Sequence, residues 1–276
     1  MKFKIGFTAE KEPEKKAAEI EAKAPEEAPA RKSLVKIFFP QRGFACTYYN
    51  DLFDLHIGDL VYVDGKLEGK RGKVIDISYT FKIKLSDYKR VIAKIDTDIS
   101  GEFCYIGDEL FSFDRRSIPF EKMLPYFKAP ANPDEEYASA KDDKFYSLND
   151  LEGMGASVNA VKLGAADFGC GEVLYLSVDG NKGHAIVGED DLHEIEFDYK
   201  NGMIANITCG CWECGFCRHG AAAVFALKSA LEKIEKQFPK RFENSGFFAV
   251  MPKISFMNII ASIDNDSIGS FVINKN

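Results

Sequence analysis

Short runs of β-branched and aromatic residues recur between residues 34 and 114, separated by Gly, Asp and Asn. The runs are LVKIFF, LVYVDG, GKVIDI, YTFKIKL and RVIAKI, and this spacing predicts several short strands. In FKIKL the strict alternation places the apolar residues on one face and Lys82 and Lys84 on the other. We therefore predict that residues 34–114 form a β-rich, SH3/OB-like module, built as a small barrel or half-barrel.

The second half of the chain changes from a strand period to a helix period. Residues 151–200 contain the strand-like runs GEVLYLSV, HAIVG and LHEIEFDY. From Ala221 to Phe238 apolar residues recur at spacings of three and four, which predicts a long amphipathic helix that Pro239 ends. The tail from Phe247 to Ile273 holds two or three apolar runs, which we expect to be strands. Residues 151–276 are thus predicted to form a second domain, and the chain belongs to the α+β class.

Two further segments have the composition of connecting chain. Residues 1–8 have the pattern of a short strand, but from Ala9 to Ser33 the chain is almost entirely Ala, Glu, Lys and Pro. Such a segment has too few large apolar groups to offset the entropy of ordering it, so residues 1–33 are predicted to be a flexible tether. Residues 115–150 contain four prolines and a charged run. They are predicted to be a connector with one short helix near Phe120–Phe127.

Composition narrows the classes of function. The 276 residues suffice for two domains, and a formal net charge of −7 argues against a protein whose whole surface binds nucleic acid. No run approaches the roughly 18 apolar residues that span a bilayer, and no secretory signal begins the sequence. We therefore expect no membrane partner and a cytoplasmic location. Thiols stay reduced there, so the seven cysteines are interpreted as metal ligands and buried thiols instead of disulfides.

Four metal-binding side chains lie close together in NITCGCWECGFCRHGAAAVFAL. Cys209 and Cys211 are two residues apart, so in a strand their side chains lie on one face. Cys217 and His219 lie where the long helix begins, and its first turn can bring a thiolate and an imidazole to the same point. Three thiolates and one imidazole form a closed tetrahedral site with no open position for water, as in structural Zn²⁺ sites. The sequence therefore predicts zinc as the cofactor.

Three alternatives to this ligand set stay open. Cys214 makes C-x₂-C pairs with both Cys211 and Cys217, so it is an alternative metal ligand. The second alternative is that the cysteines are buried thiols that bind no metal. The third is that two of them form a redox pair. The redox interpretation lacks the preceding strand of a βαβ unit that thioredoxin-like motifs have.

The cluster resembles the SWIM zinc-finger family, whose signature is C-x-C, a variable gap and C-x-H before an alanine-rich helix. Here the signature is Cys209-Gly-Cys211, five residues, Cys217-Arg-His219 and then GAAAVFALKSAL. The resemblance covers roughly residues 185–235, and the gap is short for the family. It implies a hairpin, the ligands and one long helix in that order, with either nucleic acid or protein as the partner.

A weaker resemblance concerns the first module. Its pattern L-x-x-G-D-x-V-x-V, followed by G-x-V, is shared by many SH3-like barrels, and it begins here at Leu55. This pattern is a general strand–turn–strand signature, so it implies a fold and no function.

Basic residues concentrate in the same module. Between Asp64 and Lys94 there are nine Lys or Arg side chains against four acidic ones, interleaved with aromatic residues. Single-strand binding surfaces use this mixture for phosphate neutralisation and base stacking, although outward lysines also keep edge strands unpaired. The residues predicted to bind single- or double-stranded nucleic acid are Lys70, Arg71, Lys73, Lys82, Lys84, Lys89 and Arg90.

The region before the metal ligands is acidic instead. Six carboxylates fall between Glu189 and Asp198, and they would repel a phosphate backbone unless they face away. This favours, as the alternative function, a protein–protein adaptor that displays the zinc domain. The chain has no G-x-S-x-G, no phosphate-loop lysine and no paired His on a helix, so we predict no enzyme activity. The sequence leaves the oligomeric state open.

Overall fold

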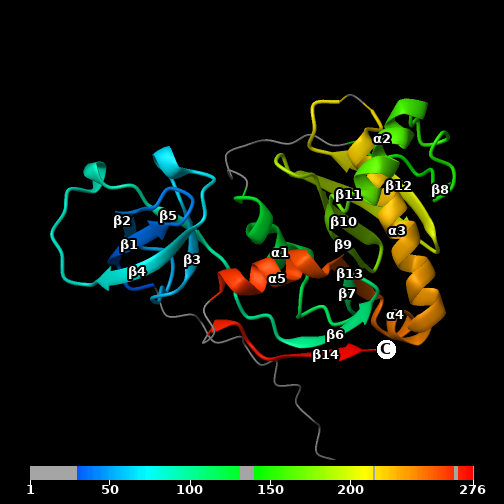
Figure 1. The fold of residues 1–276 in the computed structure, drawn as a ribbon. Coiled ribbons are helices and arrows are strands. Elements are labelled where there is room, and N and C mark those ends of the chain that lie inside the picture. The colour runs from blue at the N-terminus through cyan, green and yellow to red at the C-terminus, as the bar shows by residue number, and fades with distance from the viewer. Residues whose placement is uncertain (1–29, 131–139, 214, 264–266, 276) are drawn as a thin grey trace, which may run out of the picture.

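A computed structural model describes residues 30–130, 140–213, 215–263 and 267–275 (Figure 1). The predicted tether of residues 1–33 lies outside the described residues except for its last four positions. The described chain is a mixed α+β structure with two β-sheets, one of five strands and one of nine. The predicted fold class is therefore confirmed at this level.

The smaller sheet has the strand order β2-β1-β4-β3-β5. Along β1 every second residue is fully buried, which is the period of a strand with one face in a core. These side chains pack with valines from β3, β4 and β5 into a separate apolar cluster. The strands are β1 (Ser33–Phe39), β2 (Phe44–Asn50), β3 (Leu60–Val63), β4 (Gly72–Ser78) and β5 (Val91–Lys94).

This sheet is open, so the prediction of a closed barrel is wrong. Its two edge strands meet only at one isolated bridge between Tyr49 and Arg90, where the Tyr49 N–H donates to the Lys89 carbonyl at 2.9 Å. The predicted strand YTFKIKL is also absent. After β4 an irregular segment begins at Tyr79 and leads into the 3₁₀ turn η2 (Leu85–Asp87). The strand that could close the sheet therefore does not form.

The larger sheet has the order β14-β6-β7-β13-β9-β10-β11-β12-β8, and all neighbours are antiparallel except β14 and β6. Strands β6 and β7 lie in it, although they fall within the expected 34–114 module. The members of this sheet are β6 (Gly101–Ile106), β7 (Glu109–Ser112), β8 (Tyr146–Ser147), β9 (Val173–Asp179), β10 (Lys182–Val187), β11 (His193–Lys200), β12 (Met203–Cys209), β13 (Phe247–Pro252) and β14 (Phe271–Lys275).

Helices cover both faces of the larger sheet. The predicted short helix near Phe120–Phe127 and the predicted long helix are confirmed, although Pro239 begins a further helix where the long one ends. The tail contains a helix where strands alone were expected, and α2 was not predicted. The helices are α1 (Phe120–Phe127), α2 (Val158–Gly169), α3 (Arg218–Gln237), α4 (Pro239–Ser245) and α5 (Lys253–Ser262).

No helix in the described ranges combines the length and apolar character that a bilayer crossing needs.

Two apolar clusters lie on opposite faces of the larger sheet. In β9, Tyr175 packs on the side of α1 and α5, whereas its neighbours Leu176 and Val178 pack on the side of α3. Residues of β13 alternate in the same way. Both faces are buried because the sheet is the middle layer, with α2, α3 and α4 on one side and α1 and α5 on the other (Figure 1).

Helices α2 and α3 approach each other at Gly164. A Cβ atom at this position would lie 2.5 Å from the Cβ of Ala221 and 2.6 Å from the carbonyl oxygen of Arg218. Small residues on both helices therefore permit close backbone contact, and this contact locates the first turn of α3.

Replacing Gly164 by Ala should lower the free energy of unfolding by about 1–2 kcal/mol, because overpacking outweighs the gain in helix propensity. Urea denaturation measures this change. Gly169→Ala is the matched control on the same helix, since a Cβ there meets no atom within 4 Å. Equal stability of the two variants would contradict the close contact.

Candidate metal centre

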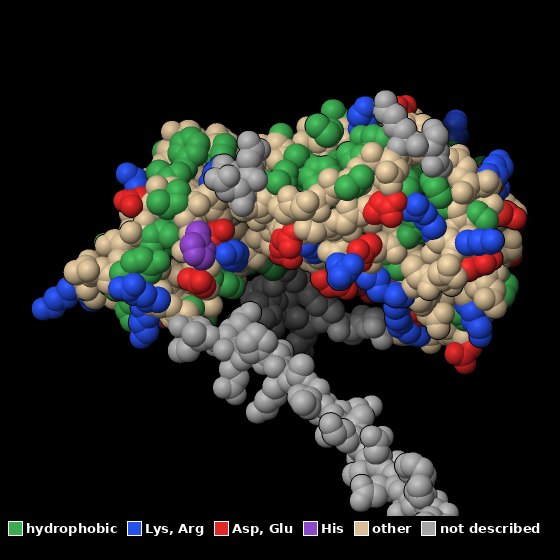
Figure 2. Space-filling view, turned by 90° about the horizontal axis from the view of Figure 1, so that it is seen from below, with side chains coloured by type: hydrophobic (Ala, Val, Ile, Leu, Met, Phe, Trp, Pro, Cys, Tyr) green, Lys and Arg blue, Asp and Glu red, His purple; other side chains and the backbone are tan. Residues whose placement is uncertain are grey.

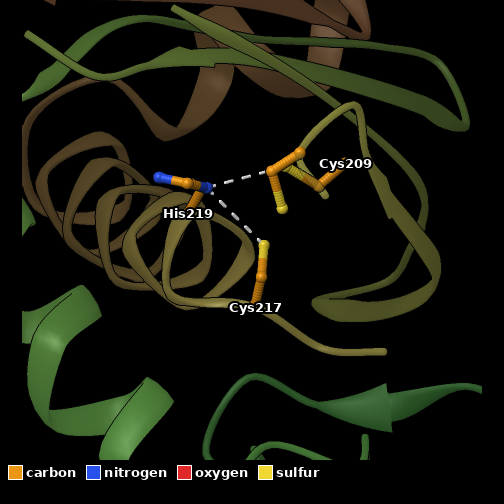
Figure 3. A group of neighbouring side chains, drawn as sticks. Cys209, Cys217 and His219 are labelled. Carbon is orange, nitrogen blue, oxygen red and sulfur yellow. Dashed lines mark hydrogen bonds between the residues drawn. The ribbon is translucent and has the colours of Figure 1, made fainter. Parts of the chain in front are cut away.

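The end of β12 and the start of α3 bring the four predicted ligands together. Cys209 is the last residue of β12, and Cys211 follows it by two positions. Cys217 is the N-cap of α3, and His219 lies in its first turn. Figure 3 shows the imidazole of His219 directed at the sulfurs of Cys209 and Cys217 across the gap between strand and helix.

The donor atoms of the four residues lie close enough together to share one ion. The Nδ1 atom of His219 lies 3.8 Å from the Sγ of Cys209 and 3.8 Å from the Sγ of Cys217, and all four donors lie within 4.8 Å of one another. Bonds of about 2.3 Å to sulfur and about 2.0 Å to nitrogen give a tetrahedron with edges of about 3.5–3.8 Å. The two sulfur–nitrogen separations are near these edges, and the cluster can hold a metal ion.

The alternative ligand Cys214 lies outside the described residues. It therefore stays an alternative. The remaining cysteines are separate from the cluster, and they differ in burial: Cys104 is buried, Cys46 is half-buried and Cys170 is exposed.

The helix start favours the thiolate form of Cys217. This side chain is 2% exposed, and its sulfur accepts a hydrogen bond from the Gly220 N–H at 3.4 Å, as an N-cap acceptor does. A hydrogen bond from Cys209, with others from His219 and Gly220, lowers the pKa of Cys217 to about 3. The same contact with Cys217, followed by burial, raises the pKa of Cys209. These contacts favour the thiolate form of Cys217, and thiolate is the form that ligates metals.

His193 supports the histidine ligand from the sheet. Its ring stacks on that of His219 with 4.0 Å between centroids. His193 lies on the same side of β11 as the buried Ile195. Burial, followed by the neighbouring His219, lowers the pKa of His193, which favours a neutral ring beside the cluster.

Arg218 lies between two ligands in the sequence but points away from them. Its Nε donates to Oδ2 of Asp167 at 2.6 Å, and its Nη2 donates to the other oxygen of the same carboxylate. Asp167, on α2, is only 3% exposed. This two-point ion pair fixes the first turn of α3 against α2, so it positions Cys217 and His219. Sequence analysis missed Asp167, because no local pattern connects it with the cluster.

The acidic residues of β11 do not surround the metal centre. Because Ile195 and Phe197 are buried under α3, the intervening Glu194, Glu196 and Asp198 lie on the opposite face of the sheet. Two of these carboxylates form ion pairs there: Glu194 with Lys128 at 2.7 Å, and Asp198 with Lys182 at 2.5 Å and Lys141 at 3.3 Å. They neither repel a ligand at the metal centre nor give it an acidic surface.

The predicted nucleic-acid-binding residues have different environments. Arg71 donates to the Tyr126 carbonyl at 3.1 Å, and Arg90 donates to the Asp51 carboxylate at 3.0 Å, so both make contacts within the protein. Lys73 is half-buried on β4. The residues exposed to solvent are Lys70, Lys82, Lys84, Lys89 and Arg90. On the face seen in Figure 2, basic side chains at the outer end of the smaller module lie beside hydrophobic ones and do not form a continuous surface.

Comparisons with protein-family models, with curated proteins and with solved structures found no match for this chain. The assignment of a metal centre therefore rests on its donor atoms and their geometry. The chain has a potential Cys₃His metal site at a strand–helix junction.

Replacing Asp167 by Ala should lower the free energy of unfolding by about 2 kcal/mol, since the charge of Arg218 loses its partner. The bound metal should stay at the same stoichiometry, because no ligand is changed. Thermal denaturation and metal analysis of the same sample measure the two effects. The double variant Asp167→Leu with Arg218→Met should recover part of the loss; a double variant less stable than the single one would contradict this role of the ion pair.

Proposed function

We propose that the protein is a non-enzymatic, zinc-stabilised binding protein of the SWIM zinc-finger type. The observation that supports this proposal is the convergence of Cys209, Cys211, Cys217 and His219, with all donor atoms within 4.8 Å. Three thiolates favour a soft or borderline metal such as Zn²⁺ over Mg²⁺ or Ca²⁺. Four protein ligands fill a tetrahedral shell and leave no position for water or substrate, so the ion has a structural role.

The ion would stabilise the junction on which the C-terminal region depends. Cys209 ends a strand near the edge of the larger sheet, and Cys217 begins the longest described helix. A bound ion joins these two elements at their ends. Because a preformed site is absent from the unfolded chain, the binding free energy of the metal contributes to folding.

The purified protein should contain about one equivalent of zinc. Replacing Cys209 or His219 by Ala should reduce this content below about half an equivalent and lower the melting temperature, because an incomplete shell binds the ion weakly. Metal analysis by mass spectrometry and thermal denaturation measure the two effects.

Cys170→Ser is the matched control, since this exposed thiol lies outside the cluster. It should retain both zinc and stability. A wild-type protein with less than half an equivalent after zinc supplementation would exclude the proposed metal.

Association with nucleic acid through the smaller module is the second candidate function. It is supported by the exposed Lys82 and Lys84 on the irregular segment after β4, which alternate with the half-buried Phe81 and Ile83. Cations on an irregular segment can follow a phosphate backbone. The exposed Tyr79 lies nearby, with the Arg31 guanidinium 4.1 Å from the centre of its ring.

If this second function holds, the full-length protein should bind a single-stranded oligonucleotide with an affinity that falls steeply as salt rises. Replacing both Lys82 and Lys84 by Ala should weaken binding about three- to tenfold, because two phosphate contacts are lost. Lys228→Ala on α3 is a control of similar charge. Fluorescence anisotropy at several salt concentrations measures this; no binding at low salt would leave the protein–protein adaptor as the function.

A further inference from the structure

A cleft of about 460 Å³ opens beside the metal centre, within the size range of ligand sites. It lies between β12, the residues that lead into β8, and the chain that links β12 to α3. Its apolar lining comes from Met154, Ile207 and Phe216, and Cys209 contributes to one wall. The charged groups that line it are Asp142, Lys144 and Glu213.

The main chain along this cleft lacks a neighbouring strand on one side. Strand β12 pairs with β11 along most of its length, but β8 covers its other side only at Met203 and Ile204. From Ala205 to Cys209 no other strand in the described ranges pairs with this outer edge. This stretch contains no lysine or proline, but Asn206 and Ile207 form a β-bulge opposite β11. Its regularly paired residues are Ala205, Thr208 and Cys209.

The side chain of Asn206 holds the opposite wall in place. Its amide accepts from the Asp142 N–H at 2.9 Å and donates to the Asp142 carbonyl at 3.1 Å. The same amide also donates to the Asp198 carboxylate at 2.8 Å. Asn206 has a φ of +52°, a region that asparagine tolerates better than most residues. One side chain thus fixes the main chain of Asp142 beside β12.

We propose that this cleft binds an extended peptide of a partner protein, which adds as a strand to the outer edge of β12. Main-chain hydrogen bonds to residues 205–209 supply affinity, and every second side chain of the peptide enters the apolar lining. This proposal depends on the protein acting by binding, but not on the metal being zinc.

The charges of the cleft specify the peptide further. Asp142 and Glu213 are exposed carboxylates, whereas Lys144, the one cation in the lining, has its Nζ 4.5 Å from the centre of the Tyr146 ring. A peptide with basic residues between its apolar ones is therefore complementary. The partner segment is an extended strand in which large apolar residues alternate with Lys or Arg.

A labelled peptide of sequence KFKIGFT is a suitable probe, because its apolar and basic residues alternate. Residues 2–8 of the chain have the same sequence and would compete, so the full-length protein is used with Phe3, Ile5 and Phe7 replaced by Ser. Fluorescence anisotropy should detect saturable binding. N-methylation of one alternating set of peptide amides should weaken binding more than about tenfold, and methylation of the other set should have little effect, because only one set faces β12.

Glu213→Lys should weaken binding about three- to tenfold, whereas Glu189→Lys, an exposed charge reversal outside the cleft, should change it less than twofold. Hydrogen exchange should slow in residues 205–209 when the peptide binds. Absence of binding, or equal affinity of the two methylated peptides, would overturn the proposal. Zinc content measured on the same samples shows separately whether the metal centre is intact.

Discussion

The meeting of three sulfur atoms and one imidazole at the junction of β12 and α3 is the constraint on which this end of the molecule depends. Cys217 favours the thiolate form, and burying that charge without a partner is costly. A cation shared by the four groups would supply the partner. Hydrogen bonds from Cys209, His219 and the Gly220 N–H lower the pKa of Cys217 and favour one negative charge there.

Other contacts around the junction are consistent with this constraint. The stacked ring of His193 orients the histidine ligand from the sheet, and the pair of Arg218 with Asp167 holds the same helical turn from α2. Gly164 permits the two helices to approach closely enough for that ion pair. The ligands therefore come from a strand end and a helix start that are separately fixed by packing, which is how a preorganised site is built.

The parts that sequence predicted are those encoded locally. The helix at Phe120–Phe127, the apolar stripe of α3 and the four clustered ligands each depend on residues within a few turns of one another. Helix α2 was missed because Val158–Gly169 contains Asn, Asp and two glycines, and its stability comes from contact with α3. Helix α5 contains three isoleucines, so propensity favoured a strand and tertiary packing decided otherwise.

Long-range pairing was also beyond local patterns. The runs that form β6 and β7 look like continuations of the first module, yet β6 pairs with β14 from the far end of the chain and β7 pairs with β13. The open cleft beside the metal centre likewise depends on where β8 stops pairing with β12, which no periodicity encodes. Nor could the sequence show that the carboxylates of β11 face away from the ligands, because that depends on which side α3 covers.

X-ray absorption at the zinc edge tests the central claim most directly. For the zinc-loaded full-length protein, a closed Cys₃His centre predicts three sulfur ligands at about 2.3 Å and one nitrogen ligand at about 2.0 Å, with no water bound to the ion. Four sulfur ligands would mean that Cys214 replaces His219, and an oxygen ligand would mean that the site is open. Either result would contradict a closed Cys₃His centre at the start of α3.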